Sequence, residues 1–313
     1  MKANHRHLVI GALVLGATTL FSAAGFADGS TESPQAIYAG RAGVYKDLDP
    51  GSLEDVTPVD RIKAVTSGNV APTQVWQALE HAERVECLDC IPMVANLLYD
   101  PSTTTREISA WWLRRRIFGV FGKGQVYQQT IQTLGDQSQS ESKCAYAAQA
   151  LGEFLAEAGV PVVANAAIHD PSAMVRTASV KALKRLNNQG PNSEIAQAMS
   201  DPDVNVRLAA LDASTRVHVF TGVPSVVKLI SDNSSLVRRG AAEALGTMHA
   251  VDAVAGLSAL ADPGNEPDAD VRIAAVAALG QIGDSAGRSA VAAAQNDPDS
   301  LVRDAASIAL RRL

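Results

Sequence analysis

Aromatic side chains are scarce in this sequence of 313 residues, where Phe, Trp and Tyr together make up 4% of the chain. The strands of sandwiches and barrels depend on aromatic and β-branched residues, so this scarcity disfavours those folds. Basic residues are also in the minority, with 27 Lys and Arg against 33 Asp and Glu. Because phosphates attract basic surfaces, we do not expect this chain to bind nucleic acid.

Long apolar runs are lacking except at the N-terminus. There, a short basic start precedes the uncharged run Leu8–Phe21, and small residues follow up to Ala27. This order predicts a secretory signal peptide over residues 1–27, with cleavage after Ala27 or Ala24; an uncleaved anchor would need roughly 20 apolar residues. Cleavage removes two of the 27 basic residues and none of the 33 acidic ones, which leaves a net charge of −8. The sequence predicts a periplasmic or secreted protein of a bacterial cell envelope, without a membrane span after cleavage.

One pattern recurs along most of the remaining chain. An Asp is followed six positions later by an Arg, and in most copies seven positions after that by a Leu. The clearest copies are "HDPSAMVRTASVKALKRL" from His169, "SDPDVNVRLAALDASTRV" from Ser200, "SDNSSLVRRGAAEALGTM" from Ser231 and "NDPDSLVRDAASIALRRL" from Asn296. The leading Asp residues stand at positions 100, 136, 170, 201, 232, 262 and 297. Two copies are irregular: Asp262 reaches Arg272 only after an insertion, and Asp136 reaches Cys144, in the arginine position, two residues late.

Each copy predicts two short helices. Asp-Pro ends the first helix, since the residue before proline avoids the helical region. The run "VRxAAxxAL" then places apolar residues on one face of a second helix. Two short helices cannot bury their apolar faces alone, so the units must stack, and their alanines permit close approach. The fold class is therefore all-α, an α-solenoid of about seven two-helix units.

The pattern "DPxxxVRxAAxxAL" resembles HEAT repeats, specifically the short bacterial kind of the phycobilin lyase type, over roughly residues 88–313. This resemblance implies a scaffold more often than an enzyme. It also implies that the Asp and Arg residues of neighbouring units interlock as a structural ladder. The residues assigned to this ladder by resemblance are Asp170, Arg176, Asp201, Arg207, Asp232, Arg238, Asp297 and Arg303.

The segment before the repeats divides into two parts. Residues 28–70 are rich in Gly, Pro, Ser and Asp without a sustained period, which predicts a flexible leader. The stretch "APTQVWQALEHAERV" from Ala71 then predicts a helix that covers the open end of the stack. The solenoid with its cap therefore spans residues 71–313.

Three cysteines remain to be explained. Cys87 and Cys90 are three apart, while Cys144 should lie about one helix length away, roughly 15 Å, beyond disulfide reach. We therefore expect Cys87 and Cys90 to pair and Cys144 to be a buried free thiol. The pair is interpreted as a structural staple; thiol–disulfide exchange is the alternative, although the flanking Glu86 and Asp89 disfavour a thiolate.

No catalytic or metal-binding set is recognisable in the sequence. The four histidines outside the signal segment are scattered over different units, and the dipeptide His-Glu does not occur. Thiolate metal sites usually need four ligands, which three cysteines do not supply. The glycine-rich "FGVFGKGQ" lacks the spacing of a phosphate loop. We therefore expect no catalytic residues, no metal and no cofactor, and a protein that is not an enzyme.

The candidate binding residues occupy positions that vary between units. Trp111 stands five residues after Arg106, where other units have Lys181, Asp212 and Glu243. A variable position indicates exposure, so these side chains should face outward from the second helices, which line the concave surface in stacks of this kind. Arg114 and Lys184 lie on the same face. The predicted binding residues are Trp111, Arg114, Lys181, Lys184, Asp212 and Glu243, while Trp112 is expected in the core.

These observations favour an exported scaffold that binds another protein of the cell envelope along the concave second helices. The alternatives belong to a different class. One is a thiol–disulfide exchange factor that uses Cys87 and Cys90. The other is a lyase-like accessory factor for a bound cofactor, which depends on fold analogy alone.

Overall fold

The computed structural model describes residues 58–67, 70–84, 87–116, 124–187 and 192–313. Residues 1–57, which include the predicted signal peptide, lie outside the described residues. The described part is helical and contains no strand. All described residues belong to one compact unit.

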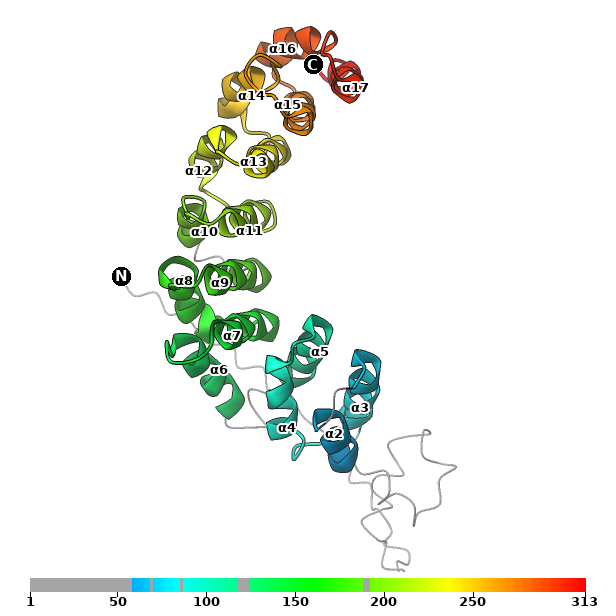
Figure 1. Cartoon of the computed structure of the whole chain (residues 1–313), viewed down its shortest axis with the longest axis vertical. Coiled ribbons are helices and arrows are strands. Elements are labelled where there is room, and N and C mark those ends of the chain that lie inside the picture. The colour runs from blue at the N-terminus through cyan, green and yellow to red at the C-terminus, as the bar shows by residue number, and fades with distance from the viewer. Residues whose placement is uncertain (1–57, 68–69, 85–86, 117–123, 188–191) are drawn as a thin grey trace, which may run out of the picture. The chain divides into compact units, whose positions relative to one another are not determined.

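The helices form seven consecutive pairs arranged in two layers (Figure 1). The first helices of the pairs are α4 (Ile91–Asn96), α6 (Gln125–Gly135), α8 (Val160–His169), α10 (Asn192–Ala198), α12 (Val223–Lys228), α14 (Val254–Leu260) and α16 (Arg288–Ala294). The second helices are α5 (Thr103–Arg114), α7 (Glu141–Phe154), α9 (Ala173–Leu186), α11 (Val204–Ser214), α13 (Ser235–Thr247), α15 (Ala269–Ile282) and α17 (Ser300–Ala309). Short 3₁₀ turns adjoin several of them: η3 (Leu97–Tyr99), η5 (Glu157–Gly159), η6 (Leu229–Ser231), η7 (Val251–Ala253) and η8 (Ser285–Gly287). The predicted α-solenoid of about seven units is confirmed.

An eighth pair precedes the seven. The expected capping helix is α3 (Pro72–Arg84), which packs on α5 as the other second helices pack on one another. It is preceded by α2 (Pro58–Thr66), which contacts α3 and α4 and buries Ile62 completely. The leader predicted over residues 28–70 therefore ends earlier. A short helix with a single strongly buried residue gives little periodic signal, which is why the sequence did not indicate it.

The repeated Asp and the residue two positions after it explain where most second helices begin. Asp201 Oδ1 accepts the backbone N–H of Asp203 at 2.8 Å, which closes a local turn. Asp203 then caps α11 by accepting the N–H of Asn205 at 2.8 Å. The side chains that cap second helices in this way are Ser102, Ser140, Asp203, Asp268 and Asp299.

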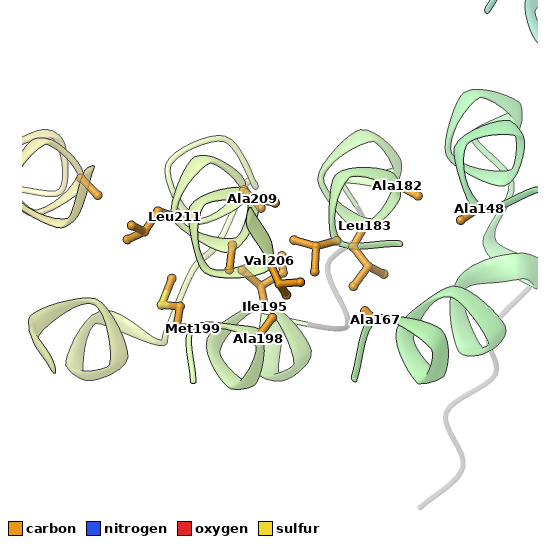
Figure 2. Packing of buried hydrophobic residues seen from close by; sticks show 14 of the residues in the cluster. Ala148, Ala167, Ala182, Leu183, Ile195, Ala198, Met199, Val206, Ala209 and Leu211 are labelled. Atoms are coloured by element: carbon orange, nitrogen blue, oxygen red, sulfur yellow. The ribbon is translucent and has the colours of Figure 1, made fainter. Parts of the chain in front are cut away.

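Small residues let the second helices approach closely. A Cβ atom built on Gly280 would lie 2.7 Å from the Cβ of Ala309 on the next second helix. Larger side chains fill the space between the two layers. Figure 2 shows Leu183, Ile195 and Val206 between the helices α8 and α10 of one layer and α9 and α11 of the other. The core is thus a continuous strip, and no pair has a core of its own.

Candidate functional site

Ion pairs link the second helices α9, α11, α13 and α15 each to the unit that follows. Arg176 Nε and Nη2 donate to the carboxylate of Asp201 at 2.7 and 2.9 Å. Its Nη1 donates to the carbonyl of Asp170, the leading acid of its own unit, at 2.8 Å. The pair Arg207–Asp232 repeats this arrangement, with Nη2 to Oδ1 at 2.9 Å. Each arginine therefore fixes its own turn and the next unit together.

The ladder passes through Glu266 and not through Asp262, the leading acid predicted for this irregular copy. Arg238 donates to the two carboxylate oxygens of Glu266 at 2.6 and 2.8 Å, whereas Asp262 is exposed. Burial alone would raise the pKa of Glu266, but the hydrogen bonds from Arg238 bring this pKa below its ordinary value. Glu266 precedes Arg272 by six residues and is followed by proline, so it is the true leading acid. Accepting Glu as well as Asp in the pattern would have found it.

The last rung is the most buried. Arg272 donates to both oxygens of Asp297 at 2.8 and 2.9 Å, and the two side chains are 5% and 0% exposed. Hydrogen bonds from Arg272 hold the pKa of Asp297 below its ordinary value. Arg303 binds the carbonyls of its own turn, those of Asp297 and Pro298. It belongs to the predicted set but bonds to no carboxylate among the described residues.

The regular ladder is missing between α5 and α9. Arg106 donates to the side chain of Gln149 at 2.9 Å and lies 3.8 Å from the ring centre of Tyr146. It forms no ion pair with an acid among the described residues. Cys144, in the next arginine position, is a buried free thiol 3.7 Å from the carbonyl oxygen of Asp136. Burial raises the pKa of Cys144, which keeps the thiol protonated. The carboxylate of Asp170 accepts a hydrogen bond from the side chain of Gln137, where later units have an arginine as the donor.

Cys87 and Cys90 lie at disulfide-bonding distance, with Cα atoms 5.4 Å apart, between α3 and α4. Their exposed fractions are 8% and 0%. Thiol–disulfide exchange requires attack on an accessible sulfur. This burial fits a staple better than an exchange pair.

Two tryptophans stack on the layer of second helices. Trp76 of α3 and Trp111 of α5 have ring centroids 5.4 Å apart and planes inclined by 24°. Trp76 is 43% exposed, and Trp111 is half-buried against the core. Trp112, the next residue, points the other way and is completely buried, with the Arg116 guanidinium 3.9 Å from its ring centre. Helical geometry thus gives the adjacent tryptophans different environments.

The tryptophans border an open groove across α5, α7, α9 and the start of α11. Its larger part has a volume of about 800 Å³, and it adjoins a smaller hollow at the tryptophans through the shared residues Glu107, Glu153 and Arg185. We call these two parts together the tryptophan groove. Its polar and charged lining residues are Thr103, Arg106, Glu107, Arg114, Tyr146, Gln149, Glu153, Thr177, Lys181, Lys184, Arg185, Asp203 and Asn205, and its prominent apolar ones are Trp76, Ile108, Trp111 and Met174.

Only some of the predicted binding residues line the tryptophan groove. Four of them line the tryptophan groove: Trp111, Arg114, Lys181 and Lys184. Asp212 lies beside the groove, and its carboxylate accepts a hydrogen bond from Lys184 Nζ at 2.6 Å. Glu243 lines a separate hollow between α13 and α15. Sequence reasoning missed Trp76, although Val75, Ala78, Leu79 and Ala82 supply the buried face of α3 and leave Trp76 on the other side.

Two further features of the described residues bear on function. They contain no group of three or more His, Cys, Asp or Glu side chains placed to hold a metal ion. In this part of the chain no helix is long and apolar enough to cross a membrane.

The stacked helical pairs define the class of protein, an α-solenoid. The family model for HEAT repeats matches residues 192–266, which include α10 to α13. Residues 192–266 therefore match HEAT repeats, and the same arrangement of paired helices continues on both sides of this segment. No curated protein matches the sequence.

Solved structures resemble this chain in fold. YibA of Escherichia coli shares 18% sequence identity, over 71% of this chain and 92% of YibA, with a TM-score of 0.50. The complex of CpcE and CpcF of phycocyanin lyase from Nostoc sp. shares 20% identity, over 71% of this chain and 86% of that one, with a TM-score of 0.39. Human deoxyhypusine hydroxylase shares 20% identity, over 84% and 99%, with a TM-score of 0.35.

Proposed function

We propose that the chain is an exported scaffold that binds a partner protein in the tryptophan groove and does not act as an enzyme. The observation that carries this proposal is the stacked pair of Trp76 and Trp111 at the end of an open groove. Tryptophan and arginine are enriched among residues that dominate binding energy at protein interfaces. Here both tryptophans adjoin Arg114, and 43% of Trp76 remains exposed.

The proposed location is the periplasm or the cell exterior. The N-terminal sequence has the order of a signal peptide, as argued above. Disulfides persist in oxidising compartments and are rare in the cytosol. The pair Cys87 and Cys90, at bonding distance, is compatible with export.

The test is affinity capture of the partner from the envelope fraction of the source cells, followed by titration of the purified partner. The groove variant is Trp111→Ala. The matched control is Ile308→Ala, which changes the corresponding position of α17, five residues after its arginine, where Ile308 is 52% exposed. We expect Trp111→Ala to weaken binding at least tenfold, about 1.4 kcal/mol, and Ile308→Ala to leave it unchanged.

Two results would count against the proposal. Equal affinity of Trp111→Ala and the unchanged protein would remove the groove as the binding site. Mixed disulfides with several proteins that disappear in the double variant Cys87→Ser/Cys90→Ser would favour the exchange function. Circular dichroism of each variant checks that the helical stack is intact.

A further inference from the structure

The charge of the tryptophan groove is opposite in sign to that of the whole chain. Its lining contains five basic residues and three acidic ones: Arg106, Arg114, Lys181, Lys184 and Arg185 against Glu107, Glu153 and Asp203. The full sequence has a formal net charge of −6. A local excess of one sign on a chain of the other sign selects a ligand by charge.

Two of the five cations are not engaged by any residue that the structure describes. Arg185 contacts Glu153 at 3.1 Å, and Lys184 contacts Asp212 at 2.6 Å. Arg106 is held within the ladder turn by carbonyl groups. Arg114 and Lys181, in contrast, form no hydrogen bond or ion pair with any residue that the structure describes, and both line the groove.

Apolar groups stand beside these free cations. Trp76 and Trp111 form one wall next to Arg114, and Met174, which is 53% exposed, lies in the larger part of the groove with Lys181. Small residues, including Ala145, Ala178 and Ala182, also line the larger part. A lining of alanines with apolar and cationic side chains at intervals suits an extended chain whose side chains alternate in character.

The charge changes sign farther along the layer of second helices. The hollow between α13 and α15 is lined by Glu243, Asp270 and a single cation, Arg239, which contacts both acids at 3.7 and 3.5 Å. No unengaged cation is left there among the described lining residues. Of these two hollows, only the tryptophan groove therefore has unengaged cations among its described lining residues.

We propose that the tryptophan groove binds an acidic, extended segment of a partner protein. An aromatic or aliphatic side chain of this segment packs against Trp76 and Trp111, and its carboxylates lie against Arg114 and Lys181. This inference depends on the proposed scaffold function and specifies the chemistry of the partner.

The test is selection of peptides from a random display library on the mature protein. Selection on the unchanged protein is compared with selection on Lys181→Glu, on Trp111→Ala, and on a charge control, Lys228→Glu. Lys228 is an exposed lysine of α12, in the other layer. Peptides that are recovered are then titrated by fluorescence anisotropy at low and high NaCl, with heparin as a competing polyanion that is not a peptide.

The proposal expects recovered peptides rich in Asp and Glu around one aromatic or aliphatic residue. Their affinity should fall about three- to tenfold in Lys181→Glu, as for loss of an exposed ion pair and its replacement by repulsion. It should also fall with added salt, and Lys228→Glu should bind normally. Selection on Lys181→Glu should shift toward peptides containing lysine.

The outcomes separate this inference from the scaffold function. Peptides of neutral or basic character whose binding depends on Trp111 would overturn the acidic partner and leave the scaffold standing. Peptides indifferent to Trp111→Ala would overturn both. Heparin that binds the groove as tightly as the peptides, with the same dependence on Lys181, would also overturn the proposal, because the site would then recognise charge without a peptide.

Discussion

The rung Arg272–Asp297 should hold the last helical pair, α16 and α17, on the stack. Two hydrogen bonds of 2.8 and 2.9 Å join the side chains, which are 5% and 0% exposed. Asp297→Asn preserves the shape and the oxygen that accepts the N–H of Asp299. It leaves the Arg272 charge buried without a counter-charge. Removing one partner of a buried ion pair costs about 3–5 kcal/mol.

This loss should be local, because units of a repeat protein contact only their neighbours. Amide hydrogen exchange resolved by segment is therefore the assay. At about 1.4 kcal/mol per tenfold change, this loss should accelerate amide exchange in α17 by about a hundredfold to a few thousandfold. Exchange in α9 should not change. The matched control is Asp212→Asn, whose partner Lys184 is 28% exposed, where a loss of about 0–1 kcal/mol is expected.

A double variant distinguishes a buried charge from lost packing. Arg272→Met/Asp297→Leu removes both charges, and apolar replacement of a buried pair is often neutral or stabilising. Exchange in α17 should therefore return toward that of the unchanged protein. If Asp297→Asn accelerates exchange in α17 by less than about threefold, the ion pair does not hold the last helical pair on the stack. The same conclusion follows if Asp212→Asn has an equal effect.

Other changes test the packing, the staple and the ionisation of the ladder. Gly280→Ala should destabilise the stack by about 1–3 kcal/mol in urea unfolding, because the new Cβ lies 2.7 Å from another atom. A Cβ atom built on Gly135 has no neighbouring atom within 4 Å, so Gly135→Ala should raise the free energy of unfolding by about 0.5–1 kcal/mol. Cys87→Ser/Cys90→Ser should cost about 2 kcal/mol, the value for closing so short a loop. The depressed pKa of Asp297 adds stability above its ordinary pKa of 3.8. Protection of α17 should therefore fall as pH drops below that value, and Asp297→Asn should remove this part of the dependence.

The repeat was predictable from sequence because each part of it has a local cause. Asp201 closes its turn, Asp203 caps the helix, and Arg207 binds the carbonyl of Asp201 at 2.8 Å. All three interactions join residues at fixed short spacing, so they recur as a pattern. Glu266 escaped the pattern because the carboxylate is carried by a different residue type. The helix α2 escaped it because its single strongly buried residue follows no such spacing.

The groove was only partly predictable. The position shared by Trp111 and Lys181 follows from repeat spacing, and both residues line the groove. The stacking of Trp76 on Trp111 joins different helices, α3 and α5. No spacing rule within one unit relates them. Glu243 occupies the same position of its repeat as Trp111 but lies several units away from it, in a separate hollow. Residues at equivalent repeat positions therefore need not belong to the same site.

Stability and binding should separate along this chain, and the neighbouring residues Trp111 and Trp112 test that expectation. The engaged carboxylates of the ladder lie from Asp201 onward, whereas the tryptophan groove lies mainly over α5, α7 and α9, and no rung joins α5 to α7 or α7 to α9 among the described residues. Trp112→Ala empties a completely buried site and should cost about 3–5 kcal/mol. Trp111→Ala loses one stacked ring pair, about 0.5–1.5 kcal/mol, while it removes a wall of the groove. Urea unfolding and partner titration on both variants decide the matter: equal losses of stability would mean that Trp111 is a core residue and that the groove has no separate role.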